Sequence, residues 1–204
     1  MLSTFARRNR NACPQGSDAP AFTRTAFLAS VLVIAIGATL QAQAAPIDET
    51  TASPHVRPTR DVRTLVDDAA RGSGAIRALM DRLEALDVTV YIRAITFADS
   101  DLEGRLALLA GQVGHRYLVI ELACGRSRLS QMSTLGHELH HAVEIAEEPS
   151  VVDPRTLAAL YERIGRKTGD WNGRQTFETD AAADAGLRAR RELLVNSTRR
   201  SHGT

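Results

Sequence analysis

The stretch Gly136–His141 reads GHELHH and contains the pattern His-Glu-x-x-His, which runs from His137 to His141. Positions i and i+4 of an α-helix lie one above the other on the same face. On a helix, the imidazoles of His137 and His141 can therefore bind one Zn²⁺ ion, and Glu138 lies beside that ion. The pattern predicts a zinc site in which Glu138 takes a proton from a water molecule at the metal.

The residues around this pattern favour a helix that follows a buried strand. Apolar residues recur at three- and four-residue spacing over Ser130–Ala146, which is typical of a helix with one buried face. Just before it, Tyr117–Leu122 is a short apolar run that predicts a buried strand, and a strand edge can hold an extended peptide over the metal. His140 lacks the i+4 relation to His137, so we expect it to flank the site.

The rest of the chain predicts a small α+β domain. We expect further helices over 61–70, 75–86, 154–164 and 177–195, and further strands over 88–92 and 105–109. The glycine- and charge-rich segment 165–175 is expected to be a loop. This order predicts a small three-stranded antiparallel sheet packed against about five helices.

The N-terminus has the features of a secretory signal peptide. Four arginines precede an apolar run over 26–40, and Ala42–Ala44 is a small-x-small cleavage pattern. We therefore expect residues 1–45 to be a signal peptide, the protein to be periplasmic or secreted, and no stable membrane insertion after cleavage. The alternative is a membrane anchor formed by the uncleaved N-terminal segment.

Composition sets the boundaries of the domain and argues against one class of partner. The segment 46–60 is predicted to be a polar linker, 61–195 the folded domain, and 196–204 a basic flexible tail. Residues 46–204 carry 21 Lys plus Arg and 23 Asp plus Glu, a net charge of −2, so we expect no nucleic-acid partner. Arginines gather near the C-terminus, where we expect them to solvate the last helix, with contact to an anionic surface as the alternative. They are Arg188, Arg190, Arg191, Arg199 and Arg200.

The sequence resembles the zincin superfamily of zinc metallopeptidases over two stretches, Tyr117–Ile145 and Phe177–Ala189. It is most similar to a minimal gluzincin, in which a glutamate from the helix after the motif helix is the third zinc ligand. The resemblance implies a zincin-like domain, a Zn²⁺ cofactor and a peptide or protein substrate. It covers less than half of the chain after residue 45, so it points to a class of enzyme.

By this resemblance Glu178 is the expected third ligand. Positions 182, 185 and 189 share its predicted helix face and are all alanine, which lets this helix approach the motif helix closely. The family pattern has an aspartate four residues after the ligand, and position 182 departs from it. Asp180 or Asp184 could supply that aspartate from a shifted place, and each stays open as an alternative ligand.

Glu144 is a further acid on the motif helix, seven residues after His137. On a straight helix the three side chains of His137, His141 and Glu144 would lie almost in a line. Three ligands in a line cannot occupy three corners of a tetrahedron, so Glu144 is disfavoured as a ligand. We expect it to support the site from outside or to form a salt bridge.

The expected activity is hydrolysis of peptide bonds by an exported zinc-dependent endopeptidase. Glu138 is the expected general base, and a further hydrogen-bond donor should stabilise the oxyanion. We expect Tyr161 to be that donor, with His115 as the other candidate. Two alternatives remain open: a zinc-binding domain without turnover, and a helical interaction domain in which the motif is accidental.

Overall fold

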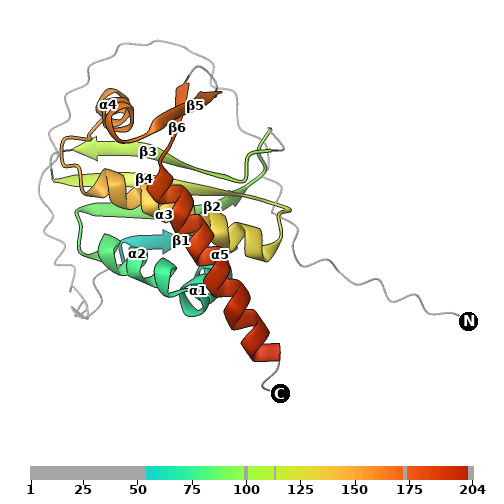
Figure 1. The fold of residues 1–204 in the computed structure, drawn as a ribbon. Coiled ribbons are helices and arrows are strands. Elements are labelled where there is room, and N and C mark those ends of the chain that lie inside the picture. Colours follow the sequence, from blue (N-terminus) through green and yellow to red (C-terminus); the bar gives the residue numbers. More distant parts are fainter. Residues whose placement is uncertain (1–53, 99–100, 113, 172–173, 202–204) are drawn as a thin grey trace, which may run out of the picture. The chain divides into compact units, whose positions relative to one another are not determined.

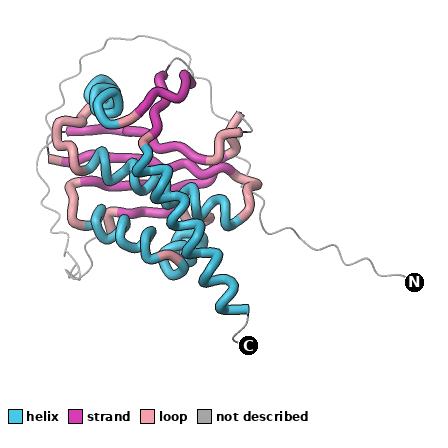
Figure 2. The backbone as a smooth tube through the Cα atoms, in the orientation of Figure 1, coloured by secondary structure: helices cyan, strands magenta, loops and turns pink. Residues whose placement is uncertain are grey.

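The computed structural model describes residues 54–98, 101–112, 114–171 and 174–201, which form an α+β structure (Figures 1 and 2). The helices are α1 (Arg63–Gly72), α2 (Gly74–Glu84), α3 (Arg128–Ala146), α4 (Pro154–Ile164) and α5 (Asp180–Ser201). The strands are β1 (Val56–Pro58), β2 (Val88–Ile95), β3 (Gly104–Gln112), β4 (His115–Ala123), β5 (Arg166–Trp171) and β6 (Arg174–Glu178). The predicted signal peptide, residues 1–45, lies outside the described residues.

The main sheet has four strands in the order β1-β2-β4-β3, and it is mixed (Figure 1). β1 runs parallel to β2, β2 runs parallel to β4, and β3 runs antiparallel to β4. The expected α+β class is confirmed, but the expected three-stranded antiparallel sheet was wrong. β3 and β4 form a hairpin that turns at Gly114, where φ is +91°. The chain reverses direction at this hairpin, and β4 inserts between β2 and β3. β4 therefore lies parallel to β2 and antiparallel to β3.

The fourth strand of this sheet comes from the segment that was expected to be an unstructured linker. Val56–Pro58 pairs with β2, and the side chain of Val56 is buried. The carboxylate of Glu84, at the end of α2, accepts hydrogen bonds from the backbone N–H groups of His55 (2.9 Å) and Val56 (3.2 Å). The linker prediction was therefore wrong for these residues. Pro58 is compatible with this strand, because β1 lies at the edge of the sheet.

Helices α1, α2, α3 and α5 pack together on one face of the sheet (Figure 2). Alternate residues of the two central strands point into the core between these layers, because side chains alternate across a strand. They are Val88, Val90 and Ile92 of β2 and Leu118, Ile120 and Leu122 of β4, all fully buried. α3 contributes Leu135, Leu139 and Ile145 to the same core.

The segment before α5 forms a second sheet instead of the expected loop. β5 and β6 pair as an antiparallel hairpin, and Glu178 is the last residue of β6. The next residue, Thr179, caps α5, because its Oγ1 accepts a hydrogen bond from the N–H of Ala182 at 3.1 Å. α5 thus begins at Asp180 and not at residue 177, and it continues to Ser201, so much of the predicted tail is helical.

Candidate metal centre

Both histidines of the motif lie on α3, on the same side of the helix. α3 begins after Ser127, whose hydroxyl accepts a hydrogen bond from the N–H of Ser130 at 3.1 Å. The ring centroids of His137 and His141 are 4.9 Å apart, as expected for positions i and i+4. His141 is buried, whereas the side chain of His137 is 24% exposed, so one side of the pair can be reached from solvent.

Close packing of α5 against α3 brings the third residue to this pair. A Cβ added to Gly136 would lie only 2.8 Å from the Cβ of Ala189, and one added to Gly186 would lie 3.2 Å from the Cβ of His137. Ala182 and Ala189 are fully buried. The prediction that small residues let the last helix approach the motif helix is confirmed. This approach holds the start of α5, and with it Glu178, over the histidines.

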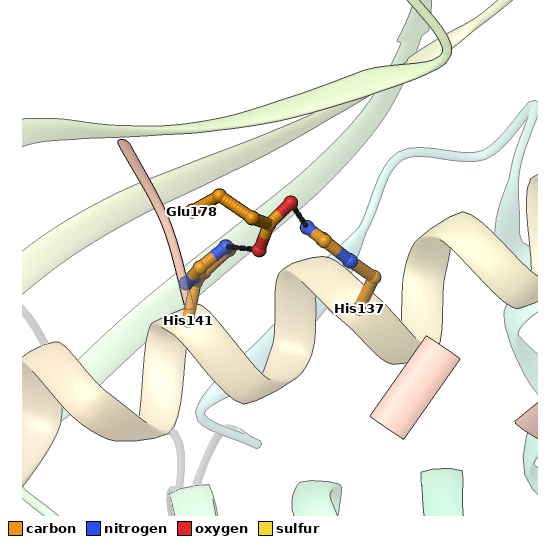
Figure 3. A group of neighbouring side chains, drawn as sticks. All are labelled: His137, His141 and Glu178. Carbon is orange, nitrogen blue, oxygen red and sulfur yellow. Dashed lines mark ion pairs between the residues drawn. The ribbon is translucent and has the colours of Figure 1, made fainter. Parts of the chain in front are cut away.

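The Glu178 carboxylate lies between the two imidazole rings (Figure 3). Its Oε2 is 3.3 Å from Nε2 of His137, and its Oε1 is 3.4 Å from Nε2 of His141. A tetrahedral zinc ion with bonds of about 2.0–2.1 Å separates its ligand atoms by roughly 3.3 Å. Two imidazole nitrogens and a carboxylate at this spacing are a donor set that fits Zn²⁺.

The structure also places the other acids that the sequence left open as ligands. Among the described residues, His137, His141 and Glu178 are the one group of three or more His, Cys, Asp or Glu whose ligand atoms lie within 4.8 Å of one another. Asp180 and Asp184 are exposed on α5 and are not in this group. It is therefore Glu178 that the fold brings to the histidines.

Glu144 supports the histidines from outside the donor set. Its Oε2 accepts a hydrogen bond from Nδ1 of His141 at 2.8 Å, and its Oε1 accepts one from Oγ1 of Thr179 at 2.7 Å. Glu144 thus joins α3 to the residue after Glu178. With Nδ1 of His141 donating to Glu144, Nε2 of that ring is left to bind a metal.

Tyr161 lies on α4, and its hydroxyl contacts the far side of the His141 ring. The hydroxyl oxygen is 3.2 Å from Nδ1 and 3.4 Å from the backbone oxygen of His141, and it is buried. Burial raises the pKa of the Tyr161 hydroxyl, so it stays protonated. Nδ1 lies across the ring from Nε2, the atom that faces Glu178. This place favours a role in positioning His141 over the expected role at the oxyanion.

His115, the other candidate donor, lies at the start of β4. Its Nε2 is 2.9 Å from Oγ1 of Thr89, and its ring packs against Tyr117 at a centroid distance of 4.8 Å. The contacts of His115 within the described part of the chain do not reach His137, His141 or Glu178. A structural role explains these contacts.

Glu138 is a buried acid beside the metal-binding group. Its residue is 6% exposed, and burial raises the pKa of its carboxyl to about 7. A Cβ added to Gly104, at the start of β3, would lie 3.4 Å from its Oε1, so β3 passes close to Glu138. A carboxyl whose pKa is near 7 can both accept and return a proton at neutral pH.

The charges around His141 predict how the stability of the metal-free protein depends on pH. Burial lowers the pKa of His141, but hydrogen bonds with Glu144 and Glu178 outweigh it and raise the pKa to about 9. Protonated His141 therefore stabilises the fold fully below its unfolded pKa of about 6.5, and this contribution is lost as pH rises through 9. We expect the free energy of unfolding to fall by about 3 kcal/mol across this range.

Urea unfolding with a metal chelator present, at several pH values between 6 and 10, measures this dependence. His141→Gln is the control: it lacks the titrating imidazole, so the fall above about pH 7.5 should disappear. The carboxyl of Glu138, whose pKa is about 7, still titrates at lower pH in this variant. A wild-type free energy of unfolding that stays level or rises with pH would contradict the charged state assigned to His141.

Glu144→Gln is expected to weaken zinc binding by about 10- to 100-fold, because the amide cannot match the carboxylate in polarising and orienting His141. Competition with a chelating dye measures the dissociation constant. The matched control is Glu162→Gln on α4, an exposed glutamate, which should bind zinc as wild type does. Equal affinities for the two variants would show that Glu144 does not support the site.

Neither protein-family models, nor the curated proteins, nor the solved structures include a match to this chain. What the site can do is therefore inferred from the chemistry of its own residues.

Proposed function

We propose that this protein is an exported zinc-dependent metallopeptidase that hydrolyses peptide bonds. The observation that carries the proposal is the group of His137, His141 and Glu178, with Glu138 buried next to it. Export is proposed from the sequence pattern of residues 1–45, and N-terminal sequencing of the mature protein tests cleavage near residue 45.

The donor set is suited to a catalytic zinc ion more than to a structural one. Three protein ligands leave one position open, whereas structural zinc sites are closed by four. Burial lowers the pKa of His137, which favours the neutral imidazole that binds metals. Although burial opposes it, hydrogen bonding with His141 holds the pKa of Glu178 below its usual value, so this ligand is ionised. When bound, zinc supplies a Lewis acid that polarises a carbonyl and lowers the pKa of water.

The residues of the chain divide the remaining work. Glu138 accepts the proton of the attacking water and passes it to the leaving amine, for which a pKa near 7 is favourable. Glu144 holds His141 in the orientation and tautomer that the site requires, and Tyr161 packs behind the same ring. Peptide-bond hydrolysis follows from these roles.

The proposed substrate site is the edge of β3. Among the described residues β3 pairs only with β4, so its other edge can add an extended peptide through backbone hydrogen bonds. The start of β3 adjoins Glu138, which would place such a peptide beside the metal-binding group. β3, and not the central strand β4, is the strand suited to this role.

Removal of the metal tests the proposal. We expect the purified protein to bind one zinc ion, to cleave members of a mixed library of unstructured peptides, to stop on treatment with a chelator, and to recover when zinc is restored. Zinc binding without cleavage of any library peptide would favour a non-catalytic zinc domain. Absence of zinc binding, with no effect of chelator on thermal stability, would favour an accidental motif.

A further inference from the structure

The outer face of α5 carries exposed aliphatic side chains. Leu187 is 56% exposed, Leu194 44% and Val195 51%. At 100° per residue these three positions fall in one sector of the helix. The other exposed large hydrophobic residues in the described part of the chain, Leu109 and Ile164, lie on different elements. The last turns of α5 extend past the other described helices (Figure 1).

Contacts on the opposite face fix which side of α5 points outward. Leu193 is buried in the core. The carboxylate of Glu192 accepts hydrogen bonds from the Ser73 hydroxyl (2.7 Å) and the N–H of Ala75 (2.9 Å). The side-chain amide of Asn196 donates to the backbone oxygen of Gly72 at 2.8 Å. These contacts hold the helix in one rotation, so the aliphatic side chains cannot turn into the core.

Basic side chains lie both among and beside the aliphatic ones. At 100° per residue Arg191 falls between Leu187 and Val195, and the other exposed arginines fall outside them. Exposed arginines stand at four positions between residues 187 and 199. They are Arg188, Arg190, Arg191 and Arg199. The sole acid in the sequence between Ala185 and Arg199 is Glu192, whose carboxylate is turned toward α2. This half of α5 therefore presents positive charge and apolar surface together.

We propose that this outer face binds an anionic lipid surface. Exposed aliphatic and basic side chains that share one side of a helix let that side lie against a membrane interface. Long arginine side chains can reach lipid phosphates while the aliphatic groups enter the headgroup layer. No helix among the described residues is both long and apolar enough to cross a membrane.

The composition of the face favours lipid over an acidic protein. A stable protein interface buries roughly 800 Å² on each side and is anchored by aromatic side chains in pockets. The α5 outer face has three aliphatic anchors and no aromatic residue. Binding to a lipid surface requires neither a large buried area nor aromatic anchors, because each basic residue near an anionic bilayer strengthens binding by roughly fivefold on its own. The inference is independent of the zinc site.

The experiment is co-sedimentation of the full chain with phosphatidylcholine vesicles, with and without phosphatidylglycerol. The test variant is Arg190→Gln/Arg191→Gln/Arg199→Gln. The matched control is Arg60→Gln/Arg155→Gln/Arg166→Gln, which removes the same charge from exposed arginines elsewhere. All proteins share the apolar N-terminal run and its arginines, so a difference between variants reports on α5 and not on that segment.

We expect wild type to prefer the anionic vesicles, and the α5 variant to bind them on the order of 100-fold more weakly. The control variant should stay within about threefold of wild type, because distant charges are screened by salt. Leu187→Gln/Leu194→Gln should also weaken binding. The proposal is overturned if wild type shows no preference for anionic vesicles, which would favour an acidic protein partner. It is equally overturned if the α5 variant binds anionic vesicles as strongly as wild type does. The same holds if binding of the control variant is weakened as much as that of the α5 variant.

Discussion

Glu138→Gln is expected to keep zinc bound and to lower the rate of peptide hydrolysis by about 10³-fold. Glutamine has nearly the same shape as glutamate, so the buried position of residue 138 stays filled and the ligands stay in place. What the amide cannot do is accept a proton. Because Glu138 is not one of the residues whose ligand atoms cluster, its loss should separate catalysis from metal binding.

Two measurements on the same preparation check this result. Metal content per chain should equal that of wild type, and the turnover number for the best library peptide should fall. Glu162→Gln, an exposed glutamate of α4, is the control for the chemical change and should leave both unchanged. Cleavage by Glu138→Gln at the wild-type rate would show that Glu138 is not the general base, and it would not contradict the zinc site.

Glu178→Ala is expected to lower zinc affinity by at least about 100-fold, more than the loss of an outer partner such as Glu144 causes. The substitution removes the carboxylate whose oxygens lie 3.3 Å from Nε2 of His137 and 3.4 Å from Nε2 of His141. Two histidines on one helix then bind the ion alone, and hydrolysis stops with the loss of the metal. Thr179 still caps α5, so the helix should keep its place.

Asp180→Ala is the matched control, because this acid is two residues away, exposed, and outside the metal-binding group. Metal analysis and dye competition should give wild-type zinc binding for Asp180→Ala and a loss for Glu178→Ala. The opposite pattern would assign the third ligand to Asp180. Full zinc binding by both variants would indicate that Asp184 or Glu144 is the third ligand.

The parts of the fold that depend on local periodicity could be predicted from the sequence. The helix that carries His137 and His141, and the alanines that let α5 approach it, follow from spacing alone. β1 could not be found, because three residues with a proline carry no periodic signal. The parallel pairing of β2 with β4 depends on which strand inserts between two others, and strand periodicity does not encode that order.

In the candidate site too, features within one helix were predictable, and contacts between elements were not. The pair of histidines is a property of one helix, and their place on it was predictable. The hydrogen bond between Glu144 and His141 could have been predicted from their i+3 spacing, which brings the two side chains together on one helix. Its second partner, Thr179, and the approach of Tyr161 depend on tertiary packing of α4 and α5. No spacing in the sequence indicates those contacts.

The ligand atoms reside on segments far apart in the chain, two on α3 and one at the junction of β6 with α5. An unfolded chain therefore offers no comparable pocket, and the proposed zinc ion would bind the native state in preference. Ligand at about a thousand times its dissociation constant adds roughly 4 kcal/mol to the stability of such a protein. If the protein is exported as proposed, the local supply of zinc would then govern how long each molecule survives.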